Sequence, residues 1–376
     1  MSPVFVVGRF PPPLDGQTLA TARLAELVGE ARAVARVSTS APEGDRVVTT
    51  EARWSLARAA HYLGTGRRLR RRLAAAPGAP VLWASVSPHP LGHARDVLTT
   101  LPAFGRARPV VAVVHRAYFD QMFRSPWTAP TARRLVRRCA AVVFLTDGLA
   151  RRAAPFVPDA KRVVIPNTVG ADVACTDAEV EAARAVRQSR PGLRLLFLGN
   201  LMPEKGYGLA LDAAARLAPS LDVRLDLVGR WPSAGAEAAF AARVAGLGLA
   251  GRVTAHGGLP HAAVKRFVLD ADALLFPSTH PSEALPVAVL EALNAGTPVV
   301  GADHGALAEV VGGAGTVVPA EAGALAEAVR PLADARAWGR ASRAARRRFE
   351  AAYSPASVQA RWLALLDRVG PPGGAG

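Results

Sequence analysis

Two carboxylates, Glu283 and Glu291, stand eight positions apart in a segment of small and apolar residues. Pro286 lies between them, and a proline suits the first position of a helix because its missing N–H would be unpaired there. Leu285, which would cap that helix, has no side-chain acceptor for the first free N–H groups. Those donors and the positive end of the helix dipole favour an anion such as a phosphate. The segment therefore predicts a pocket for a polyhydroxylated, negatively charged ligand.

The elements around these two glutamates support that interpretation. The apolar run Ala273–Pro277 ends in a loop and indicates a buried strand, and Val287–Asn294 continues as a helix that Gly296 would end. The alternative is a loop acid and a helix glutamate that are both solvated, as most glutamates are. The uncapped helix start and the flanking strands favour the ligand pocket over that alternative.

The same alternation of strand-like and helix-like runs extends along the whole chain. In the first half the expected strands are Val4–Val7, Ala33–Ser38, Pro80–Ser85, Val110–His115, Ala141–Thr146 and Arg162–Pro166. In the second half they are Arg194–Gly199, Val223–Gly229, Arg252–Ala255, Ala273–Pro277, Pro298–Gly301 and Thr316–Val318. Alanine-rich helical stretches, such as Leu209–Leu217 and Ala236–Ala245, fall between most of them. This order predicts an α/β protein with two doubly wound, Rossmann-like domains that bind ligands at the carboxyl ends of their strands.

The segment with the two glutamates resembles the family-4 retaining glycosyltransferases of the GT-B fold, in which two Rossmann-like domains face each other across a cleft. Their signature is a glutamate, seven residues, a second glutamate and then Gly-x-Pro-Val-Val, and this chain has Glu283, Glu291 and the run Ala295–Val300. Where the family often reads Glu-Gly-Phe-Gly, this chain has Pro286 at the fourth position, which removes one amide donor. The resemblance is most specific from Leu195 to Val300.

The expected domain boundaries follow from the strand pattern and this resemblance. An acceptor-side domain is expected at 1–170, a linker at 171–191 and a domain that binds the nucleotide-sugar at 192–353. The GT-B resemblance implies that a last helix at 354–369 packs back on the first domain, and the tail 370–376 is expected to be disordered.

The loop after the first strand of the second half gives a second match to the family. Gly199-Asn200 and Glu204-Lys205-Gly206 lie between a strand and a helix expected near Tyr207. Lys205 is one of three lysines in an arginine-rich chain, and a compact ammonium suits a diphosphate. The family normally has arginine where this chain has Asn200, so Arg230 or Arg9, each just after a strand, is a candidate to replace that contact.

The first half offers weaker candidates. Gly16 lies between a strand and a helical run from Thr18, where a backbone without Cβ approaches a phosphate or sugar closely; a simple turn is the alternative. His115 ends the fourth strand, and a structural role is the alternative there; the resemblance implies a place near the donor sugar. The loop Ser85–Asp96 resembles the acceptor side of a subset of the family.

The resemblance implies a glycosyltransferase that moves a sugar from a nucleotide-diphospho-sugar to an acceptor hydroxyl with retention of anomeric configuration. Glu291 would bind the ribose, Glu283 would bind the transferred sugar, and Lys205 with the start of the helix would stabilise the departing diphosphate. Because these groups would take the part of a metal ion, no metal and no other cofactor is expected. The catalytic residues are predicted to be Glu283, Lys205 and His115. The donor-binding residues are predicted to be Gly16, Asn200, Lys205, Arg230, Glu283, Ala284, Leu285 and Glu291.

Other functions stay open at this point. A sugar-nucleotide 2-epimerase shares the architecture, and a catalytically idle binding protein would keep the scaffold. A dehydrogenase is disfavoured because no Gly-x-Gly-x-x-Gly opens a helix after a strand. Nucleic-acid binding is disfavoured because the basic run lacks interleaved aromatics. The nucleotide base, the donor sugar, the acceptor and the oligomeric state are left undetermined.

Composition and charge bound the setting. Cys139 and Cys175 are the only cysteines, which argues against a disulfide framework or a structural zinc site. No secretory signal or spanning run is recognised, so a cytoplasmic protein is expected. The net charge is +16, and seven arginines without an acid fall between Arg53 and Arg72. That run either docks on anionic membrane near a lipid-linked acceptor or reflects arginine-rich composition on a solvated face, and a small natural product remains the other acceptor class.

Overall fold

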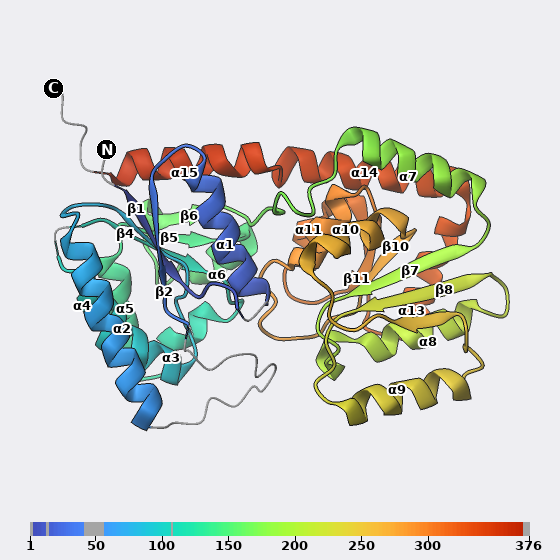
Figure 1. Cartoon of the computed structure of the whole chain (residues 1–376), viewed down its shortest axis with the longest axis horizontal. Coiled ribbons are helices and arrows are strands. Elements are labelled where there is room, and N and C mark those ends of the chain that lie inside the picture. The colour runs from blue at the N-terminus through green and yellow to red at the C-terminus, as the bar shows by residue number, and fades with distance from the viewer. Residues whose placement is uncertain (1–2, 13–14, 41–55, 107, 371–376) are drawn as a thin grey trace. The chain divides into compact units, whose positions relative to one another are not determined.

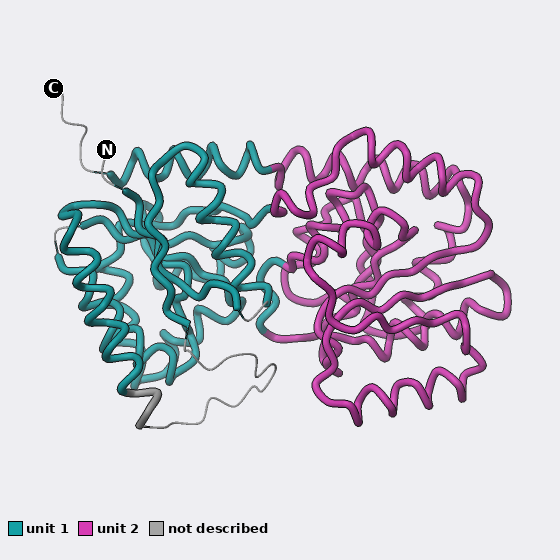
Figure 2. The backbone as a smooth tube through the Cα atoms, in the orientation of Figure 1, with its two compact units in different colours: residues 1–168, 282–285, 355–376 teal, residues 169–281, 286–354 magenta. Residues whose placement is uncertain are grey.

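The structure is a computed structural model that describes residues 3–12, 15–40, 56–106 and 108–370. The chain divides into two compact units, each with its own sheet (Figure 2). Unit 1 comprises Met1–Thr168, Ser282–Leu285 and Pro355–Gly376, and unit 2 comprises Val169–Pro281 and Pro286–Ser354. No helix among the described residues combines the length and apolarity needed to cross a membrane.

Unit 1 contains a six-stranded parallel sheet in the order β2-β1-β3-β4-β5-β6 (Figure 1). Its strands are β1 (Val4–Gly8), β2 (Val34–Ser38), β3 (Val81–Trp83), β4 (Val110–Val114), β5 (Ala141–Phe144) and β6 (Arg162–Val164). The central strands are continuously apolar and buried, as expected for a parallel sheet covered on both faces. This order places the topological switch point between β1 and β3.

Helices cover both faces of that sheet. They are α1 (Gly16–Gly29), α2 (Leu56–Ala74), α3 (Pro90–Arg95), α4 (Leu101–Ala103), α5 (Ala129–Arg138), α6 (Asp147–Ala153) and α15 (Pro355–Val369). On one face α1 and α15 pack together, and Val358 and Trp362 of α15 join the strand residues in one core. Elsewhere Trp83 of β3 meets Phe104 edge-on, with ring centroids 5.4 Å apart.

Unit 2 contains a second six-stranded parallel sheet, in the order β12-β11-β10-β7-β8-β9. Its strands are β7 (Leu193–Leu198), β8 (Val223–Val228), β9 (Val253–Ala255), β10 (Ala273–Phe276), β11 (Val299–Ala302) and β12 (Gly315–Val318). Counted within the unit, this is the 3-2-1-4-5-6 order of dinucleotide-binding folds, with the switch point between β7 and β10.

The helices of unit 2 again cover two faces (Figure 1). They are α7 (Asp177–Ser189), α8 (Tyr207–Leu217), α9 (Ala234–Gly246), α10 (His261–Asp270), α11 (Val287–Asn294), α12 (Leu307–Val311), α13 (Ala322–Val329) and α14 (Ala335–Ala352). The apolar sides of α8, α9 and α13 form one core with β7 and β8, and Trp338 of α14 completes it. On the other face α10 contacts β7, and α11 contacts β10 and β11.

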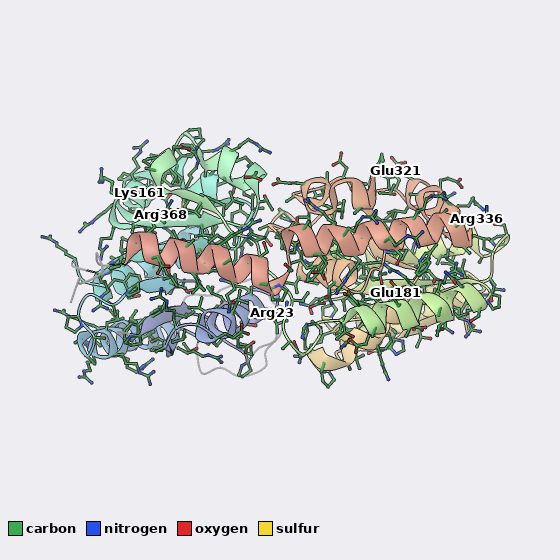
Figure 3. All side chains as sticks on the ribbon, turned by 90° about the horizontal axis from the view of Figure 1, so that it is seen from above. Arg23, Lys161, Glu181, Glu321, Arg336 and Arg368 are labelled. Carbon is green, nitrogen blue, oxygen red and sulfur yellow. The ribbon has the colours of Figure 1, made fainter. Side chains whose placement is uncertain are left out.

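All twelve expected strands are present, with ends that differ by at most two residues from the predicted ones. The expected linker 171–191 needs correction, because α7 occupies most of it. Thr176 and Glu179 form a capping box at the start of α7, and the helix packs against α10 and α14. Figure 3 shows Glu181 on α7 and Arg336 on α14 of the same unit.

Two smaller points concern the ends of helices. The structure places Pro286 at the N-cap of α11 rather than at its first position, so Leu285 is not the cap residue. Gly296 follows the helix with φ +68°, the left-handed conformation that ends a helix without strain at glycine. The expected helix 354–369 is α15 of unit 1, and the tail after residue 370 lies outside the described residues.

Candidate active site

The switch point of unit 2 lies between two loops, one after β7 and one after β10. In open α/β sheets, the connections there diverge to opposite faces and leave room for a ligand at the carboxyl edge. The loop after β7 contains Asn200 and Lys205, and the loop after β10 leads to Glu283 and α11. Two of the sequence motifs are therefore attached to adjacent strands at the edge where ligands bind.

Two glycines draw the loops of unit 2 together. A Cβ on Gly229 would stand 1.8 Å from the carbonyl oxygen of Gly199, so the turns after β7 and β8 approach each other through bare backbone. Gly206 has φ +82°, and a Cβ there would stand 2.4 Å from the carbonyl oxygen of Pro277. Close approach and left-handed backbone both require glycine. As a result, the residue after Lys205 lies directly against the loop that follows β10.

Hydrogen bonds reinforce this arrangement. The amide of Thr279 donates to the carbonyl oxygen of Glu204 at 2.9 Å, which joins the β10 loop to the β7 loop. The amide of Leu201 donates to the carbonyl oxygen of Arg230 at 2.9 Å, which joins the β7 loop to the turn after β8. The side chain of Arg230 lies against Gly258, where a Cβ would stand 2.4 Å from Arg230 Cγ. The structure thus brings the loops that carry Asn200, Lys205 and Arg230 to one edge of unit 2.

The start of α11 has no side-chain cap. Pro286 at the N-cap offers no side-chain acceptor and makes no capping hydrogen bond. The first helical residues, Val287 and Ala288, are partly exposed. Ala284 and Leu285 are buried ahead of the helix, whereas Glu283 is partly exposed. The helix end therefore retains amide donors and a positive dipole end that suit an anion.

Glu291 lies on the second turn of α11 and is only 3% exposed. Its Oε1 is hydrogen-bonded to Nε2 of His261 at 2.8 Å, and Nδ1 of His261 is hydrogen-bonded to Oδ2 of Asp172 at 2.5 Å. Both ring nitrogens of His261 are thus used, one on each carboxylate. The imidazole holds Oε1 of Glu291, and because the two carboxylate oxygens are rigidly joined, this contact also fixes the orientation of Oε2.

The far end of α11 holds the segment that contains Asp172. Asn294 donates from Nδ2 to the carbonyl oxygen of Val173 at 3.0 Å and accepts from the amide of Cys175 at 3.3 Å. Glu291 and Asn294 are three residues apart and share one face of the helix. A single helix face thus supports both ends of the Asp172–His261–Glu291 chain of contacts.

His261 and Asp172 are residues that the sequence motifs do not single out. Asp172 lies 89 positions before His261, and Glu291 lies 30 positions after it, so no local spacing links the three. A weak signal exists, because His261 opens α10 directly after Pro260, in the connection that follows β9. A polar residue at that edge of the sheet is a candidate by position alone.

The candidates of the first half lie in unit 1. Gly16 is the first residue of α1, and a Cβ there would meet no atom within 4 Å, so the protein itself does not require glycine at this position. The expected start at Thr18 was therefore two residues late. Asp15 caps the helix through the amides of Gln17 and Thr18, and Arg9 donates to Asp15 at 2.9 Å. Arg9 is thus engaged within unit 1.

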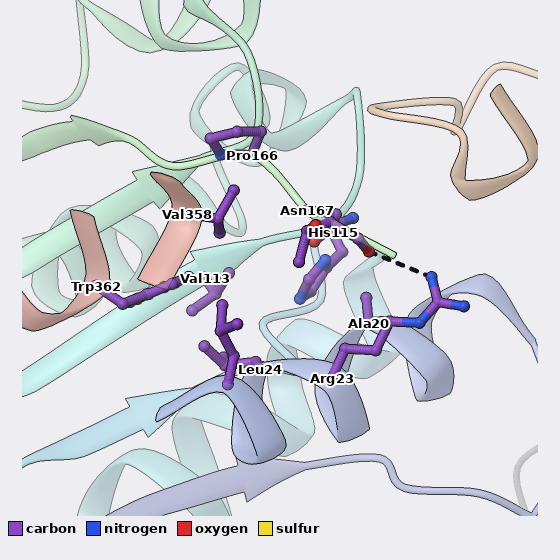
Figure 4. Close-up of a pocket in the computed structure, with 11 residues that line it drawn as sticks. Ala20, Arg23, Leu24, Val113, His115, Pro166, Asn167, Val358 and Trp362 are labelled. Atoms are coloured by element: carbon purple, nitrogen blue, oxygen red, sulfur yellow. Dashed lines mark hydrogen bonds between the residues drawn. The ribbon is translucent and has the colours of Figure 1, made fainter. Parts of the chain in front are cut away.

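His115 follows β4 directly and is held in a confined setting. Its Nε2 is buried without a hydrogen-bond partner among the described residues. A cavity of about 20 Å³ lies beside it, lined by Arg23 and Leu24 of α1 and Trp362 of α15 (Figure 4). This volume accommodates one water-sized molecule and excludes a sugar ring. Burial, and secondarily the Arg116 guanidinium, lower the pKa of His115 to about 4, so the imidazole is neutral at pH 7.

The loop Ser85–Asp96 of unit 1 is closed by its own residues. Asp96 is fully buried, accepts from the amide of Ser87 at 2.8 Å and pairs with Arg95 at 2.5 Å. Burial raises the pKa of Asp96 to about 6, although Arg95 opposes that shift. Arg95 also lies over the ring of Tyr62, 5.5 Å from its centroid. These contacts give Arg95 and Asp96 a structural role in shaping the loop after β3.

The cysteines and potential metal ligands complete the inventory. Cys139 and Cys175 are free, buried thiols, and burial raises their pKa values to about 12 and about 11, so both stay protonated at pH 7. Among the residues that the structure describes, no group of three or more His, Cys, Asp or Glu side chains could hold a metal ion.

Residues 192–335 match the family model described as Glycosyl transferases group 1. The match begins one residue before β7 and ends at the first residue of α14. It therefore spans the complete sheet of unit 2, including the loop after β7, the loop after β10 and α11.

Curated relatives match over part of their length. The chain is 34% identical over 194 residues to a 2-deoxystreptamine glucosyltransferase from Streptomyces kanamyceticus, which covers 50% of this chain and 49% of that protein. It is 30% identical over 212 residues to a phosphatidyl-myo-inositol mannosyltransferase from Mycobacterium tuberculosis, with 54% of this chain and 50% of that protein covered. The chain thus spans about half the length of these curated relatives.

Solved structures match over nearly the whole chain. HepE from Anabaena in complex with UDP gives a TM-score of 0.72 at 17% identity, with 98% of this chain and 100% of that chain covered. Sucrose-phosphate synthase from Thermosynechococcus elongatus gives a TM-score of 0.74 at 16% identity, with 98% and 99% covered. The chain has the GT-B fold. Within this GT-B fold, the stretch matched by the family model is the second Rossmann-like sheet, and the expected fold class is confirmed.

Proposed function

We propose that this GT-B protein is a retaining, metal-independent glycosyltransferase of family 4 that transfers a sugar from a nucleotide-diphospho-sugar to an acceptor hydroxyl. The observation that carries the proposal is a coincidence of two independent features. The stretch that matches the glycosyl transferase family model, 192–335, contains the whole sheet of unit 2, and the Lys205 loop and the Glu283 loop follow the two strands at its switch point. Ligands of such sheets bind at that point.

The proposed donor contacts divide by charge. Lys205, together with Asn200 and Arg230, is proposed to hold the diphosphate, assisted by the uncapped start of α11. Glu291 is proposed to bind the ribose, and Glu283 the hydroxyls of the transferred sugar. Ala284 and Leu285 would contribute backbone amides. The buried, oriented carboxylate of Glu291 supports its part, because a fixed acceptor loses little freedom when a hydroxyl binds.

The proposed reaction breaks the bond between the anomeric carbon and the diphosphate oxygen. The acceptor oxygen forms the new bond on the face that the diphosphate leaves, which retains the anomeric configuration. The departing diphosphate takes the electron pair and receives the acceptor proton. Lys205 and the α11 start are proposed to stabilise the charge that develops on it, the part that a metal ion plays in other transferases. Gly16 and His115, which belong to unit 1, are also proposed to contact the sugar.

His115 needs a particular contact to serve in that way. His115 lines a cavity too small for a sugar ring, so the proposed sugar contact lies outside that cavity. A neutral ring with a pKa near 4 can donate or accept a hydrogen bond without changing charge at pH 7. His115 is therefore proposed as a hydrogen-bonding residue rather than as a proton carrier.

The setting of the reaction is proposed from composition. Two free thiols are consistent with a reducing, cytoplasmic compartment. Peripheral contact with anionic membrane is proposed through the basic stretch 53–72, part of which lies outside the described residues. HepE structures hold UDP, so UDP-sugars are the first donors to test, followed by sugars on other bases.

A donor-binding and turnover experiment tests the proposal. Purified protein is screened by thermal shift against a panel of sugar nucleotides, and release of nucleoside diphosphate is followed with the stabilising donor in the presence of EDTA. Lys205→Gln is expected to lower kcat/KM by about 100- to 1000-fold, the usual cost of removing a group that stabilises developing charge. NMR of the glycoside formed reports the anomeric configuration.

Arg252→Gln is the matched control, because Arg252 is an exposed cation just before β9, at the opposite end of the sheet. Its turnover should stay within twofold of the wild type. Equal losses in the two variants would contradict a specific role for Lys205. Release of free sugar without any acceptor product would instead point to hydrolysis or epimerisation.

A further inference from the structure

A second pocket, of about 600 Å³, opens in unit 1 between β2 and α2. It is lined at the carboxyl end of β2 by Val37 and Ser38, and after β1 by Phe10. This is the edge of the sheet where open α/β folds bind ligands, and it flanks the β1–β3 switch point on the β2 side. The pocket is large enough for a small organic molecule.

Three guanidinium groups line this pocket. Arg68 and Arg72 are four residues apart on one face of α2, and Arg36 comes from β2. Arg68 donates from Nη2 to Oγ1 of the buried Thr65 at 2.8 Å, and Arg72 donates from Nη1 to the carbonyl oxygen of Arg36 at 3.3 Å. The second contact directs Arg72 to β2, whereas the first holds Arg68 against its own helix beside the pocket.

The pocket contains little negative charge to balance them. Among the described residues that line it, Glu26 is the one acid, and its Oε1 is 3.8 Å from Nη2 of Arg36. Both side chains of that pair are about half exposed, at 51% and 53%, so the contact is weak. Three cations against one loosely paired carboxylate leave an excess of two positive charges in a concave site.

The chemistry of the lining indicates what balances that excess. Guanidinium groups present donors in a planar fork that matches the oxygens of a phosphate, and hydroxyls such as Ser38 Oγ can add a further contact. The positively charged guanidinium groups repel one another in this concave site, and a bound anion would offset that repulsion. An amine-bearing ligand would be repelled by the same site.

We propose that the pocket formed by Arg36, Arg68 and Arg72 binds the phosphate group of a phosphorylated acceptor. That the bound molecule is an acceptor rests on the proposed function, whereas the phosphate site itself is argued from residues of unit 1 alone. The shared chemistry is a phosphate ester, and it has two sources: a soluble phosphate monoester or a phospholipid headgroup. Acceptors that carry a phosphate ester are therefore the substrate class of this protein.

Two double variants on the same helix test the site. Arg68→Gln with Arg72→Gln removes the pair that lines the pocket. Arg67→Gln with Arg71→Gln removes the same charge, also four residues apart, from exposed positions that do not line it. Isothermal titration of the full chain with glycerol 1-phosphate at 150 mM salt measures the soluble source. Cosedimentation with phosphatidylglycerol vesicles measures the lipid source.

The pocket pair is expected to weaken binding by about 10- to 100-fold, because two charge-assisted contacts are lost. The control pair should change it by less than twofold. Binding of glycerol 1-phosphate assigns a soluble ester, and binding of vesicles alone assigns a headgroup, provided that the pocket pair abolishes it and the control pair does not. Equal weakening by both pairs, or no binding of either probe by the wild type, overturns the site.

Lys205→Gln separates this site from the donor contacts of unit 2, since it should leave glycerol 1-phosphate binding unchanged. Phosphate binding without any donor turnover would keep the anion pocket and overturn the proposed function. Donor turnover without phosphate binding would do the reverse.

Discussion

Each sheet of this protein has a buried aspartate–arginine cluster, and the two clusters lie at opposite ends of their sheets. In unit 2 the buried carboxylate of Asp272 lies just before β10, at the amino end of the sheet, where it pairs with Arg187 and Arg190 at 2.5 and 2.9 Å. In unit 1 the buried carboxylate of Asp96 lies after β3, at the carboxyl end, where it pairs with Arg95. The Asp272 cluster is thus remote from the carboxyl edge of its sheet, where ligands bind, whereas the Asp96 cluster shapes that edge in unit 1.

The carboxyl edges of the two sheets therefore differ, although both units have the same parallel α/β architecture. In unit 2 the buried Asp272 cluster lies at the amino end, and the loops at the carboxyl edge carry Asn200, Lys205 and Arg230. Unit 1 closes the loops at its own switch point with Arg95–Asp96 and with Arg9–Asp15. Its pocket instead opens to one side, between β2 and α2. Donor and acceptor sites of different shape are the expected consequence.

The largest expected effect concerns the amino-end cluster of unit 2. Asp272→Asn should lower the free energy of unfolding by about 3–5 kcal/mol, because Arg187 and Arg190 would keep buried charge without a counterion. Urea unfolding followed by tryptophan fluorescence measures it, since Trp338 donates to the carbonyl oxygen of Asp272. Asp270→Asn, at a half-exposed acid nearby, should cost about 1 kcal/mol or less. Equal costs would remove the contrast between the two ends of the sheet.

The matching prediction for unit 1 depends on pH. Asp96 has a pKa near 6 in the folded chain and 3.8 as its ordinary value, so between those values the folded state holds a proton that the unfolded state has released. The free energy of unfolding should therefore fall as pH rises through this window, by up to about 3 kcal/mol. The Asp96→Asn variant cannot titrate there. Urea unfolding at pH 4, 5, 6 and 7, read from Trp83, should show the wild type losing stability relative to the variant, with no further change above pH 7.

A difference between wild type and Asp96→Asn that stays constant from pH 4 to pH 7 would contradict this account. It would mean that Arg95 outweighs burial, so that Asp96 is charged throughout.

The next prediction concerns the carboxyl edge of unit 2. His261→Phe should raise the KM for donor by about 10- to 100-fold with kcat nearly kept, because Glu291 loses the hydrogen bond that fixes its carboxylate and hydrogen bonds to charged groups are worth about 1.5–3 kcal/mol. His256→Phe is the matched control, since His256 pairs with Asp226 at 2.6 Å and has no contact with Glu291. Loss of kcat at constant KM, or the same loss in both variants, would contradict a positioning role.

The last prediction concerns the titration of His115. Its NMR resonance, assigned by difference from His115→Gln, should titrate near pH 4 rather than near the ordinary value of 6.5. Because its folded pKa is lowered, this group costs stability progressively as pH falls from 6.5 toward 4 and contributes no change between pH 7 and 8. A midpoint close to 6.5 would show that the ring reaches solvent, which would reopen a proton-carrying role for unit 1.

Sequence reasoning located the motifs better than it located their partners. Lys205 stood out because lysine is rare in this chain, yet the other lysines have structural roles. Lys161 donates to three carbonyls at the end of α5, and Lys265 pairs with Glu179 at 2.6 Å. Rarity therefore indicates a specific contact without saying that it is a ligand. His261 escaped notice because its carboxylate partners are far away in the sequence.

The missed helix α7 had a readable signal. Thr176 and Glu179 have the three-residue spacing of a capping box, which predicts a helix start in what was interpreted as a linker. The polar composition of the segment obscured it, because α7 buries few side chains, among them Val180 and Arg187. Local capping was the better guide than average polarity here.

The amino-acid sequence by itself determined the twelve strands, most of the helices between them and the division into two Rossmann-like blocks, because these follow from local periodicity and turn residues. Only the tertiary structure decided the two strand orders, the switch points and the contact of His261 with Glu291. Those depend on which apolar faces pack together and on pairs of residues far apart in the chain. The local hydrophobic pattern shows which residues are buried and whether a segment is a helix or a strand. Which strands lie next to each other in a sheet is set by packing between distant segments.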